Sequence, residues 1–161
     1  MPMTLPTPDL LLHEGRWLSL ASDPLGSWLD RRHNRHLRFR RTVPHGLRGY
    51  RAQWEVHRGR LFLTGFRARL ANGRFAGMGT IFDAYPAQFY DECGANDAAN
   101  QGPGRFAFWC SGSLVCPLGA RLEYGREGPA QLHQGTLLLD FRRGLLVGQR
   151  VEQTSSALAA A

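Results

Sequence analysis

The stretch "YRAQWEVHRGRLFLTGF", residues 50–66, decides the fold class of this 161-residue chain. Its first half alternates between apolar and polar side chains, the apolar ones being Tyr50, Ala52, Trp54 and Val56. A period of two is typical of a β-strand that buries one face. Arg58-Gly59 suits a two-residue hairpin turn, because glycine readily adopts the positive φ that such turns need. A turn there would pair Trp54 with Leu63, so the stretch predicts a hairpin with one apolar face.

The same register predicts what the opposite face of this hairpin carries. It places Phe62 opposite Glu55 and Phe66 opposite Arg51, so that aromatic and charged side chains share one surface. A surface of this kind is either covered by another segment or open to a partner. Both interpretations remain open from the sequence.

Turn signals of the same kind recur along the chain. Four X-Gly pairs separate apolar runs, namely Glu14-Gly15, Arg58-Gly59, Asn72-Gly73 and Arg143-Gly144. Asn72-Gly73 is the strongest of them, since asparagine and glycine both tolerate the two positive φ angles of a type I′ turn. The other three could be longer loops that contain a bulge. Each pair predicts a connection between two antiparallel strands.

These signals predict a mainly β fold, an antiparallel meander of eight or nine strands that forms a barrel or a sandwich. One or two short helices are expected, the first with Asp23 as N-cap and Pro24 in its first position, the second after Pro86. Residues 106–125 predict two strands around Pro117-Leu118-Gly119. Residues 94–104 are small and polar, which is typical of an exposed, mobile loop. We expect one domain over residues 1–152 and a flexible tail over 153–161.

The charge of the chain is concentrated in one segment. The net charge is +7, and every basic residue other than histidine is an arginine. Six of the arginines lie in "RRHNRHLRFRR", residues 31–41, without which the net charge would be +1. The second half of the segment alternates as a strand would, with Leu37 and Phe39 on the inner face, whereas the first half is typical of a loop.

Two interpretations of the arginine-rich segment compete. It could form a stripe that binds nucleic acid, with Phe62 or Phe66 as stacking faces. It could equally be the solvated outer face of an ordinary strand. No RNP, KH, helix-turn-helix or zinc-finger pattern occurs, which disfavours the nucleic-acid interpretation.

Catalytic and metal-binding patterns are weak. The cysteines are Cys93, Cys110 and Cys116, whose spacing fits neither a disulfide framework nor a CxxC metal pair, so we expect reduced, partly buried thiols. The six histidines form no HxH or HxxxH pair and are expected on the surface, while the four tryptophans are expected in the core. We therefore predict no enzyme, no cofactor and no bound metal. With no signal peptide or membrane-spanning stretch in sight, we expect a cytoplasmic protein.

Several segments together resemble a family of small, largely uncharacterised bacterial β-rich proteins. The shared pattern is a "PL…WL" segment, then "RGYxAxWEVxxGRLFL", "FAxWxSGxL", "PxGxxLxY" and "LxLxFxxGxLV". The matching stretches here are residues 24–29, 48–63, 106–114, 117–124 and 137–147. Similar proteins include immunity proteins, the partners of bacterial toxins. The resemblance implies a binding role and brings no catalytic residues, and the arginine-rich segment and the polar 94–104 insertion depart from it.

The expected function is therefore a non-enzymatic protein-binding protein, an immunity protein that binds and neutralises a cognate toxin. The alternative is a nucleic-acid-binding β module that uses residues 31–41. For the partner surface we predict Arg35, Arg38, Arg40, Arg51 and Phe62, with residues 94–104 as a rim. Complementary charge would speed and orient the encounter with an acidic partner surface. No membrane contact is expected, and the oligomeric state is left open.

Overall fold

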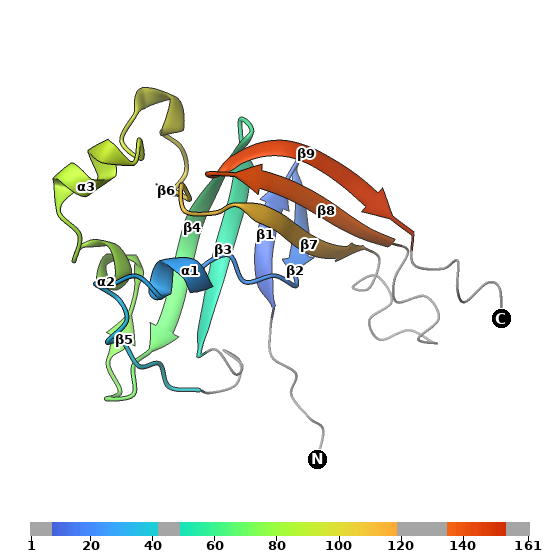
Figure 1. Ribbon diagram of the computed structural model, residues 1–161. Coiled ribbons are helices and arrows are strands. Elements are labelled where there is room, and N and C mark those ends of the chain that lie inside the picture. Colours follow the sequence, from blue (N-terminus) through green and yellow to red (C-terminus); the bar gives the residue numbers. More distant parts are fainter. Residues whose placement is uncertain (1–7, 42–48, 119–134, 154–161) are drawn as a thin grey trace, which may run out of the picture.

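The computed structural model describes residues 8–41, 49–118 and 135–153, and within them the fold is mainly β (Figure 1). A sheet of nine strands follows the order β2-β1-β3-β4-β9-β8-β7, with β5 and β6 also paired to β4. The strands are β1 (Asp9–His13), β2 (Arg16–Leu20), β3 (Tyr50–His57), β4 (Arg60–Arg69), β5 (Phe75–Ala76), β6 (Arg105–Phe106), β7 (Gly112–Leu118), β8 (Gly135–Arg142) and β9 (Leu145–Glu152). Every pairing is antiparallel except β1 with β3, which is parallel. The predicted mainly β, chiefly antiparallel fold is confirmed.

The β3–β4 hairpin has the predicted register near its turn. Trp54 pairs with Leu63 and Glu55 with Phe62, and the turn residues Arg58 and Gly59 have φ angles of 52° and 75°. Two positive φ angles at the central positions define a type I′ turn, whose twist matches that of the flanking strands. The buried indole ring of Trp54 therefore lies in the core, as the alternation predicts.

Farther from the turn, a β-bulge overturns the prediction for Phe66. The register shifts after Trp54, so that Gln53 pairs with Gly65 and Phe66 pairs with Ala52 rather than with Arg51. One extra residue on one strand moves all later side chains to the other face. Phe66 is thereby brought into the core, where only 5% of its surface is exposed.

All four X-Gly pairs lie in turns between antiparallel strands, as predicted, but one of the turns is of a different type than expected. Glu14-Gly15 and Arg143-Gly144 form two-residue turns like that of β3–β4, with φ angles of 52° and 77° and of 51° and 83°. Asn72-Gly73, the strongest signal, instead lies in a three-residue loop, since Leu70 N–H donates to Arg74 O at 2.7 Å. Only its glycine has a positive φ, of 91°. This is a type I turn followed by a left-handed residue, the usual three-residue hairpin.

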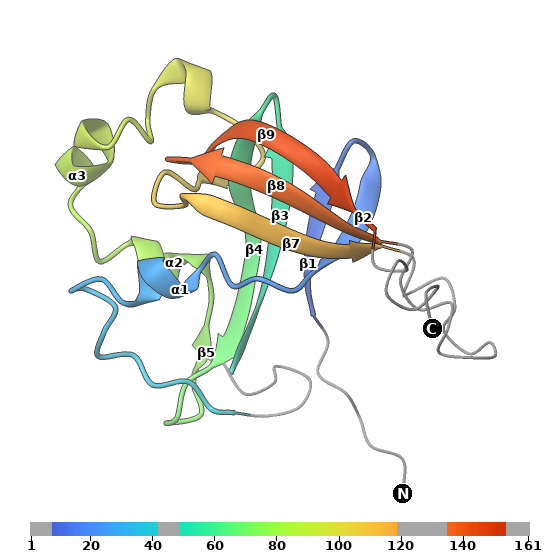
Figure 2. The ribbon, with the colours of Figure 1, turned by 45° about the vertical axis from the view of Figure 1, so that its right-hand side comes forward.

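The sheet bends back on itself, so that strands β7, β8 and β9 lie across strands β1 to β4 (Figures 1 and 2). The core lies between the two layers and takes side chains from both, among them Leu11, Trp54, Leu63, Cys116 and Leu139, each 0% exposed. At the far edge, the Ala21 N–H just after β2 donates to Val115 O of β7 at 2.8 Å. The sheet is nevertheless not closed into a barrel.

Three short α-helices cover one end of the layers, one more than expected: α1 (Gly26–Leu29), α2 (Met78–Phe82) and α3 (Ala87–Glu92). α1 begins two residues later than its Asp23-Pro24 signal predicts, because Pro24 and Leu25 form a turn first. Trp28 of α1 is completely buried, and its ring centroid lies 4.5 Å from that of Tyr85 and 4.7 Å from that of Trp109. Trp28 thus lies at the centre of an aromatic cluster in the core, as the sequence predicts.

Other expectations fail in the described residues. Of the strand predicted in the second half of the arginine-rich segment, the residues described, up to Arg41, form a single bridge, Phe39 with Leu70, and Leu37 and Phe39 do pack against the core. Pro117 and Leu118 continue β7 rather than turning. Trp17 is 48% exposed and His13 is buried, contrary to their predicted places. The predicted strand after Gly119 and all but residue 153 of the predicted tail lie outside the described residues.

Among the helices described, none has the length and apolar character needed to cross a membrane.

Candidate partner-binding surface

A group of arginines converges on the outer face of the sheet where β3 begins and β4 ends. Tyr50 and Ala68 pair across the two strands and are both buried. Because neighbours along a strand point to opposite faces, the next pair, Arg51 and Arg67, lies on the outer face with the two residues directly opposite each other. Arg69 follows Arg67 on the same face of β4.

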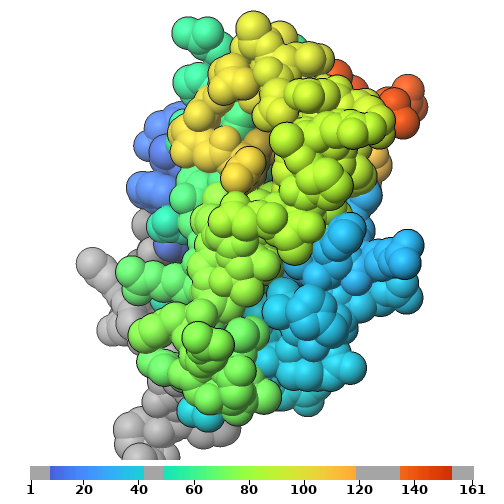
Figure 3. All heavy atoms as spheres, turned by 90° about the vertical axis from the view of Figure 1, so that its left-hand side faces the viewer, coloured from blue at the N-terminus to red at the C-terminus, as the bar shows by residue number. Residues whose placement is uncertain are grey.

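A second row of side chains runs beside this pair. Arg69 pairs with Phe75 of β5, and its guanidinium carbon lies 3.9 Å from the centre of the Phe75 ring. On the other side, the arginine-rich segment lies against β4, since Arg40 N–H donates to Arg69 O at 2.6 Å. Figure 3 shows this segment, in light blue, beside the β4–β5 end, in green. Phe39 points into the core, so Arg40 points outward.

We call the surface formed by Arg40, Arg51, Arg67, Arg69 and Phe75 the cationic face. Phe75 is 77% exposed, the largest exposed fraction among the large hydrophobic side chains described. Between Arg51 and Arg67 the surface is hollowed to about 460 Å³, with Gly65 of the β-bulge and Met78 of α2 also lining the hollow. The cationic face thus combines charge, one exposed ring and a depression.

The arginines of the cationic face have no acidic partner among the residues described: none forms an ion pair within 4.0 Å. Arg40 and Arg69 instead brace the β4–β5 turn, donating to Ala71 O at 3.3 Å and to Gly73 O at 2.7 Å. Like charges directly opposite each other in a sheet are destabilising. Within the described residues, the face is therefore a positive surface without ion pairs, held on the sheet.

The predicted partner residues fall in three different places. Arg40 and Arg51 belong to the cationic face. Arg35 and Arg38 line another hollow, which Asp23 and Asp30 share, and Arg38 donates to Arg35 O at 2.8 Å. Two carboxylates therefore lie in the same hollow as these arginines.

The prediction that Phe62 belongs to the partner surface is wrong, because Phe62 is 0% exposed and cannot contact a partner. It does lie on the outer face, but the segment that ends in β6 covers it. Phe106 pairs with it across the strands, with ring centroids 5.9 Å apart, and Gly102 passes so close that any side chain there would collide with the ring. Around Phe62, the face predicted to mix aromatic and charged side chains is therefore covered by another segment and is not open to a partner.

The sequence reasoning missed Arg67, Arg69 and Phe75. Their alternation with Phe66, Ala68 and Ala76 was visible in the sequence, but it starts after the bulge, whose position the sequence does not mark. It also missed Asn34, which is 2% exposed within the arginine-rich segment. Asn34 Nδ2 donates to Ile81 O at 3.1 Å, beside the Trp28 Nε1 donor to the same oxygen at 2.8 Å. Asn34 thereby anchors the segment to α2.

The predicted loop over residues 94–104 is exposed, as expected, and includes one short 3-10 turn, η1 (Ala98–Asn100). Hydrogen bonds brace it. Asn100 Nδ2 donates to Gly94 O at 2.6 Å, and Asn100 Oδ1 accepts from Arg60 Nε at 2.7 Å. Gln101 Nε2 donates to Asn96 O at 3.2 Å. The loop therefore leans on β4 rather than standing free.

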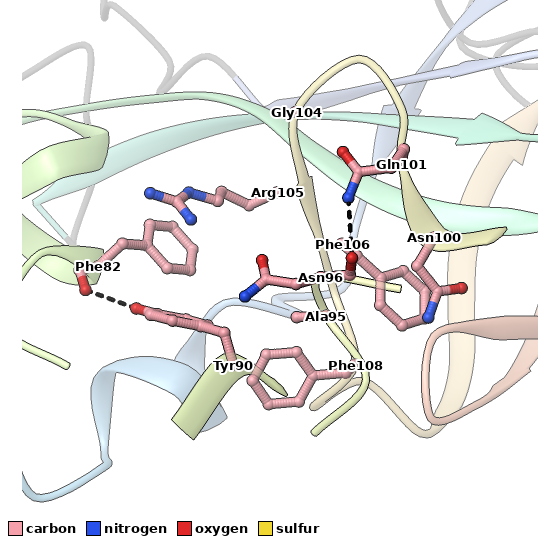
Figure 4. Close-up of a pocket in the computed structure, with 10 residues that line it drawn as sticks. All are labelled: Phe82, Tyr90, Ala95, Asn96, Asn100, Gln101, Gly104, Arg105, Phe106 and Phe108. Atoms are coloured by element: carbon pink, nitrogen blue, oxygen red, sulfur yellow. Dashed lines mark hydrogen bonds between the residues drawn. The ribbon is translucent and has the colours of Figure 1, made fainter. Parts of the chain in front are cut away.

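An aromatic pocket lies beneath this loop (Figure 4). Its volume is about 100 Å³, below the several hundred Å³ usual for a small-molecule site. Tyr90 donates to Phe82 O, and the Arg105 guanidinium lies 5.0 Å from the Phe82 ring centre and 4.0 Å from Asp83. These polar groups already have partners within the chain, so their contacts hold the loop and α3 in place.

The thiols are poorly suited to nucleophilic chemistry. Burial raises the pKa of Cys110 to about 11 and that of Cys116 to about 12, so both remain protonated at neutral pH. All three cysteines are free. No group of three or more His, Cys, Asp or Glu side chains suited to a metal ion occurs within the described part of the chain.

Comparisons of the chain with protein-family models, with curated proteins and with solved structures found no match. The resemblance to bacterial immunity proteins therefore stays a prediction.

Proposed function

We propose that this protein is a non-enzymatic binding protein that neutralises a cognate bacterial toxin by seating an acidic surface of the toxin on the cationic face. The observation that carries the proposal is the convergence of four arginines from three chain segments without an acidic partner among the described residues. Arginines that lie directly opposite each other in a sheet cost stability, so a binding role accounts for the pair better than a structural one.

The geometry of the cationic face suits carboxylates. Guanidinium groups bind carboxylates through two parallel hydrogen bonds, which adds direction to the charge attraction. The Arg69–Phe75 stack adds an exposed aromatic contact beside the charges, and aromatic and arginine side chains dominate the binding energy of protein interfaces. The strands hold these groups in place, so little order need be gained on binding.

Nucleic acid is the second candidate ligand, because Phe75 offers an exposed ring on which a base could stack next to arginines. Phe62 and Phe66, the two rings expected to stack bases, are both buried. A single exposed ring on the cationic face provides no track for successive bases. The protein-binding proposal is therefore preferred.

A growth assay tests the proposal. The reading frame next to this gene is induced in a host cell, with and without co-expression of this protein. We expect the parent chain to restore growth and the double variant Arg51→Glu/Arg67→Glu to lose that protection. Arg16→Glu/Arg142→Glu is the matched control, since both residues are exposed and the charge change is identical.

Circular dichroism must show the fold retained in both double variants. Failure of the parent chain to protect, or equal protection by Arg51→Glu/Arg67→Glu, would overturn the proposal.

A further inference from the structure

A second hollow, separate from the cationic face, lies where four parts of the fold meet. Its volume is about 370 Å³. It is lined from the segment after α1, the end of α3, the segment before β7 and the β8–β9 turn, by Arg31, Glu92, Cys93, Phe108, Trp109, Ser111 and Arg143. This volume lies at the lower end of the range of small-molecule sites. We call it the Arg31–Arg143 groove.

Arg31 is held in the groove by aromatic rings. Its guanidinium carbon lies 5.3 Å from the ring centre of Trp28, 5.7 Å from that of Phe89 and 5.8 Å from that of Phe108. Stacking of this kind fixes the side chain without neutralising its charge. Arg31 thus presents a placed positive charge to the groove.

Arg143 is placed by the β8–β9 turn. Its φ of 51° is that of a type I′ turn residue, and its backbone N–H donates to Ser111 Oγ at 2.9 Å. This bond holds the turn against the segment before β7. The Arg143 side chain is exposed, and the Ser111 hydroxyl proton remains available as a donor.

Glu92 brings the one carboxylate of the groove, and it does not cancel the two arginines. It accepts a hydrogen bond from Gln88 Nε2 at 3.4 Å, and among the described residues no ion pair within 4.0 Å joins it to Arg31 or Arg143. Burial raises the pKa of the Cys93 thiol, the charge of Arg31 lowers it, the Glu92 carboxylate raises it and the charge of Arg143 lowers it. The two guanidinium groups and the one carboxylate therefore all act on the same thiol in the groove, where the positive charges outnumber the negative one.

The aromatic wall of the groove favours a flat ligand. The indole N–H of Trp109 already donates to Pro24 O at 2.9 Å, so Trp109 offers only its ring. Phe108 lies edge-on to Trp109, with ring centroids 5.4 Å apart. A planar ring can pack against these side chains while an acidic substituent meets the arginines.

We propose that the Arg31–Arg143 groove binds a small planar organic carboxylate, with the carboxylate between Arg31, Arg143 and the Ser111 hydroxyl and the ring against Phe108 and Trp109. This ligand site is separate from the toxin-binding role, because neither arginine belongs to the cationic face.

Cys93 reports on the occupancy of this groove. Cys110 and Cys116 are buried, whereas Cys93 is half-buried and lines the groove. Alkylation of the full-length folded protein by iodoacetamide, at mildly alkaline pH, should therefore modify Cys93 first. Mass spectrometry of the cysteine peptides follows its rate with benzoate, benzamide or acetate present at equal concentration and ionic strength.

We expect benzoate to slow the alkylation of Cys93, and neither uncharged benzamide nor ring-free acetate to do so. Arg143→Gln should weaken benzoate protection by about tenfold, as should Arg31→Gln, while Arg142→Gln, an exposed neighbour outside the groove, should leave it unchanged. The Arg143→Gln variant still tests the proposal if Arg31→Gln disturbs the aromatic rings on which Arg31 stacks. Equal protection by benzoate and benzamide or by benzoate and acetate, no protection at all, or unchanged protection in Arg143→Gln would overturn the proposal.

Discussion

Arg51 and Arg67 lie directly opposite each other on the outer face of the β3–β4 hairpin. Within residues 8–41, 49–118 and 135–153, neither guanidinium has a carboxylate within 4.0 Å. Directly opposed like charges in a sheet are unfavourable, on the order of several tenths of a kcal/mol. The chain therefore carries a pair that local stability disfavours, which ties this pair to the proposed binding role.

Reversing one charge of this pair should separate stability from binding. Arg67→Glu places a carboxylate opposite Arg51, and we expect the free energy of unfolding to rise by about 0.2–1 kcal/mol. Binding to an acidic polymer should fall at the same time. Urea unfolding measures the first effect, and Arg142→Glu, which changes net charge equally, is the control. A loss of stability in Arg67→Glu would show that the two side chains do not face each other.

The β-bulge makes Phe66 and Phe75 very different in energetic role. Phe66→Ala empties a core position that is 5% exposed and should cost about 3–5 kcal/mol of unfolding free energy. Phe75→Ala removes a ring that is 77% exposed and stacked on Arg69, so it should cost less than about 1 kcal/mol. Chemical denaturation compares the two variants. Equal costs would mean that the register shift after Trp54 is absent.

These two phenylalanines show where prediction from sequence ends. The alternation around Trp54 and the X-Gly pairs are local signals, so they correctly predicted the mainly β class and all four connections between antiparallel strands, although the turn type at Asn72-Gly73 was wrong. The bulge depends on how Gly65 and Gln53 fit across two strands, and no single residue announces it. Phe66 was therefore assigned to the wrong face, whereas Tyr50 and Ala52 on the other strand were correctly placed in the core.

The candidate surface was predictable only in part, because it is assembled from segments distant in sequence. Arg40 and Arg51 were found from their charge and alternation. Phe62 was misjudged because the segment that covers it, which ends at Phe106, is about forty residues away along the chain. Arg69 was missed because its place beside Arg40 follows from a contact between two segments that no local pattern encodes.

Asn34 should prove essential for holding the arginine-rich segment. Asn34→Ala removes the buried donor to Ile81 O and should cost about 1–3 kcal/mol of unfolding free energy. His36→Ala, an exposed neighbour in the same segment, should change it by less than about 0.5 kcal/mol. Hydrogen exchange should also quicken across residues 31–41 in the Asn34 variant. Unchanged stability would contradict the anchoring role.

Alkaline pH should destabilise the fold through its buried thiols. The pKa values of Cys110 and Cys116 are raised to about 11 and about 12, above the ordinary value of 9.0. The stabilisation is fully present below pH 9 and is lost as pH rises through the folded-state values, because the unfolded chain releases these protons first. Each thiol can lower the free energy of unfolding by up to about 1.4 kcal/mol for each unit by which the pH rises in this range.

Tyr90, whose pKa burial raises to about 12, adds to this loss above pH 10. Denaturation between pH 8 and 11 tests the effect, with the double variant Cys110→Ala/Cys116→Ala as comparison. The variant should be less stable at neutral pH but should lose less stability as pH rises. Parallel slopes in the two proteins would exclude the thiols as the cause.

The most direct test of the central claim is the binding of the full-length protein to poly-L-glutamate and to single-stranded DNA of matched charge, measured at low and moderate salt. We expect poly-L-glutamate to bind more tightly than DNA at moderate salt. We also expect Arg51→Glu/Arg67→Glu to lose most of this affinity and Arg16→Glu/Arg142→Glu to keep it. Tighter binding of DNA, or equal loss in the two double variants, would contradict a cationic face built for an acidic protein partner.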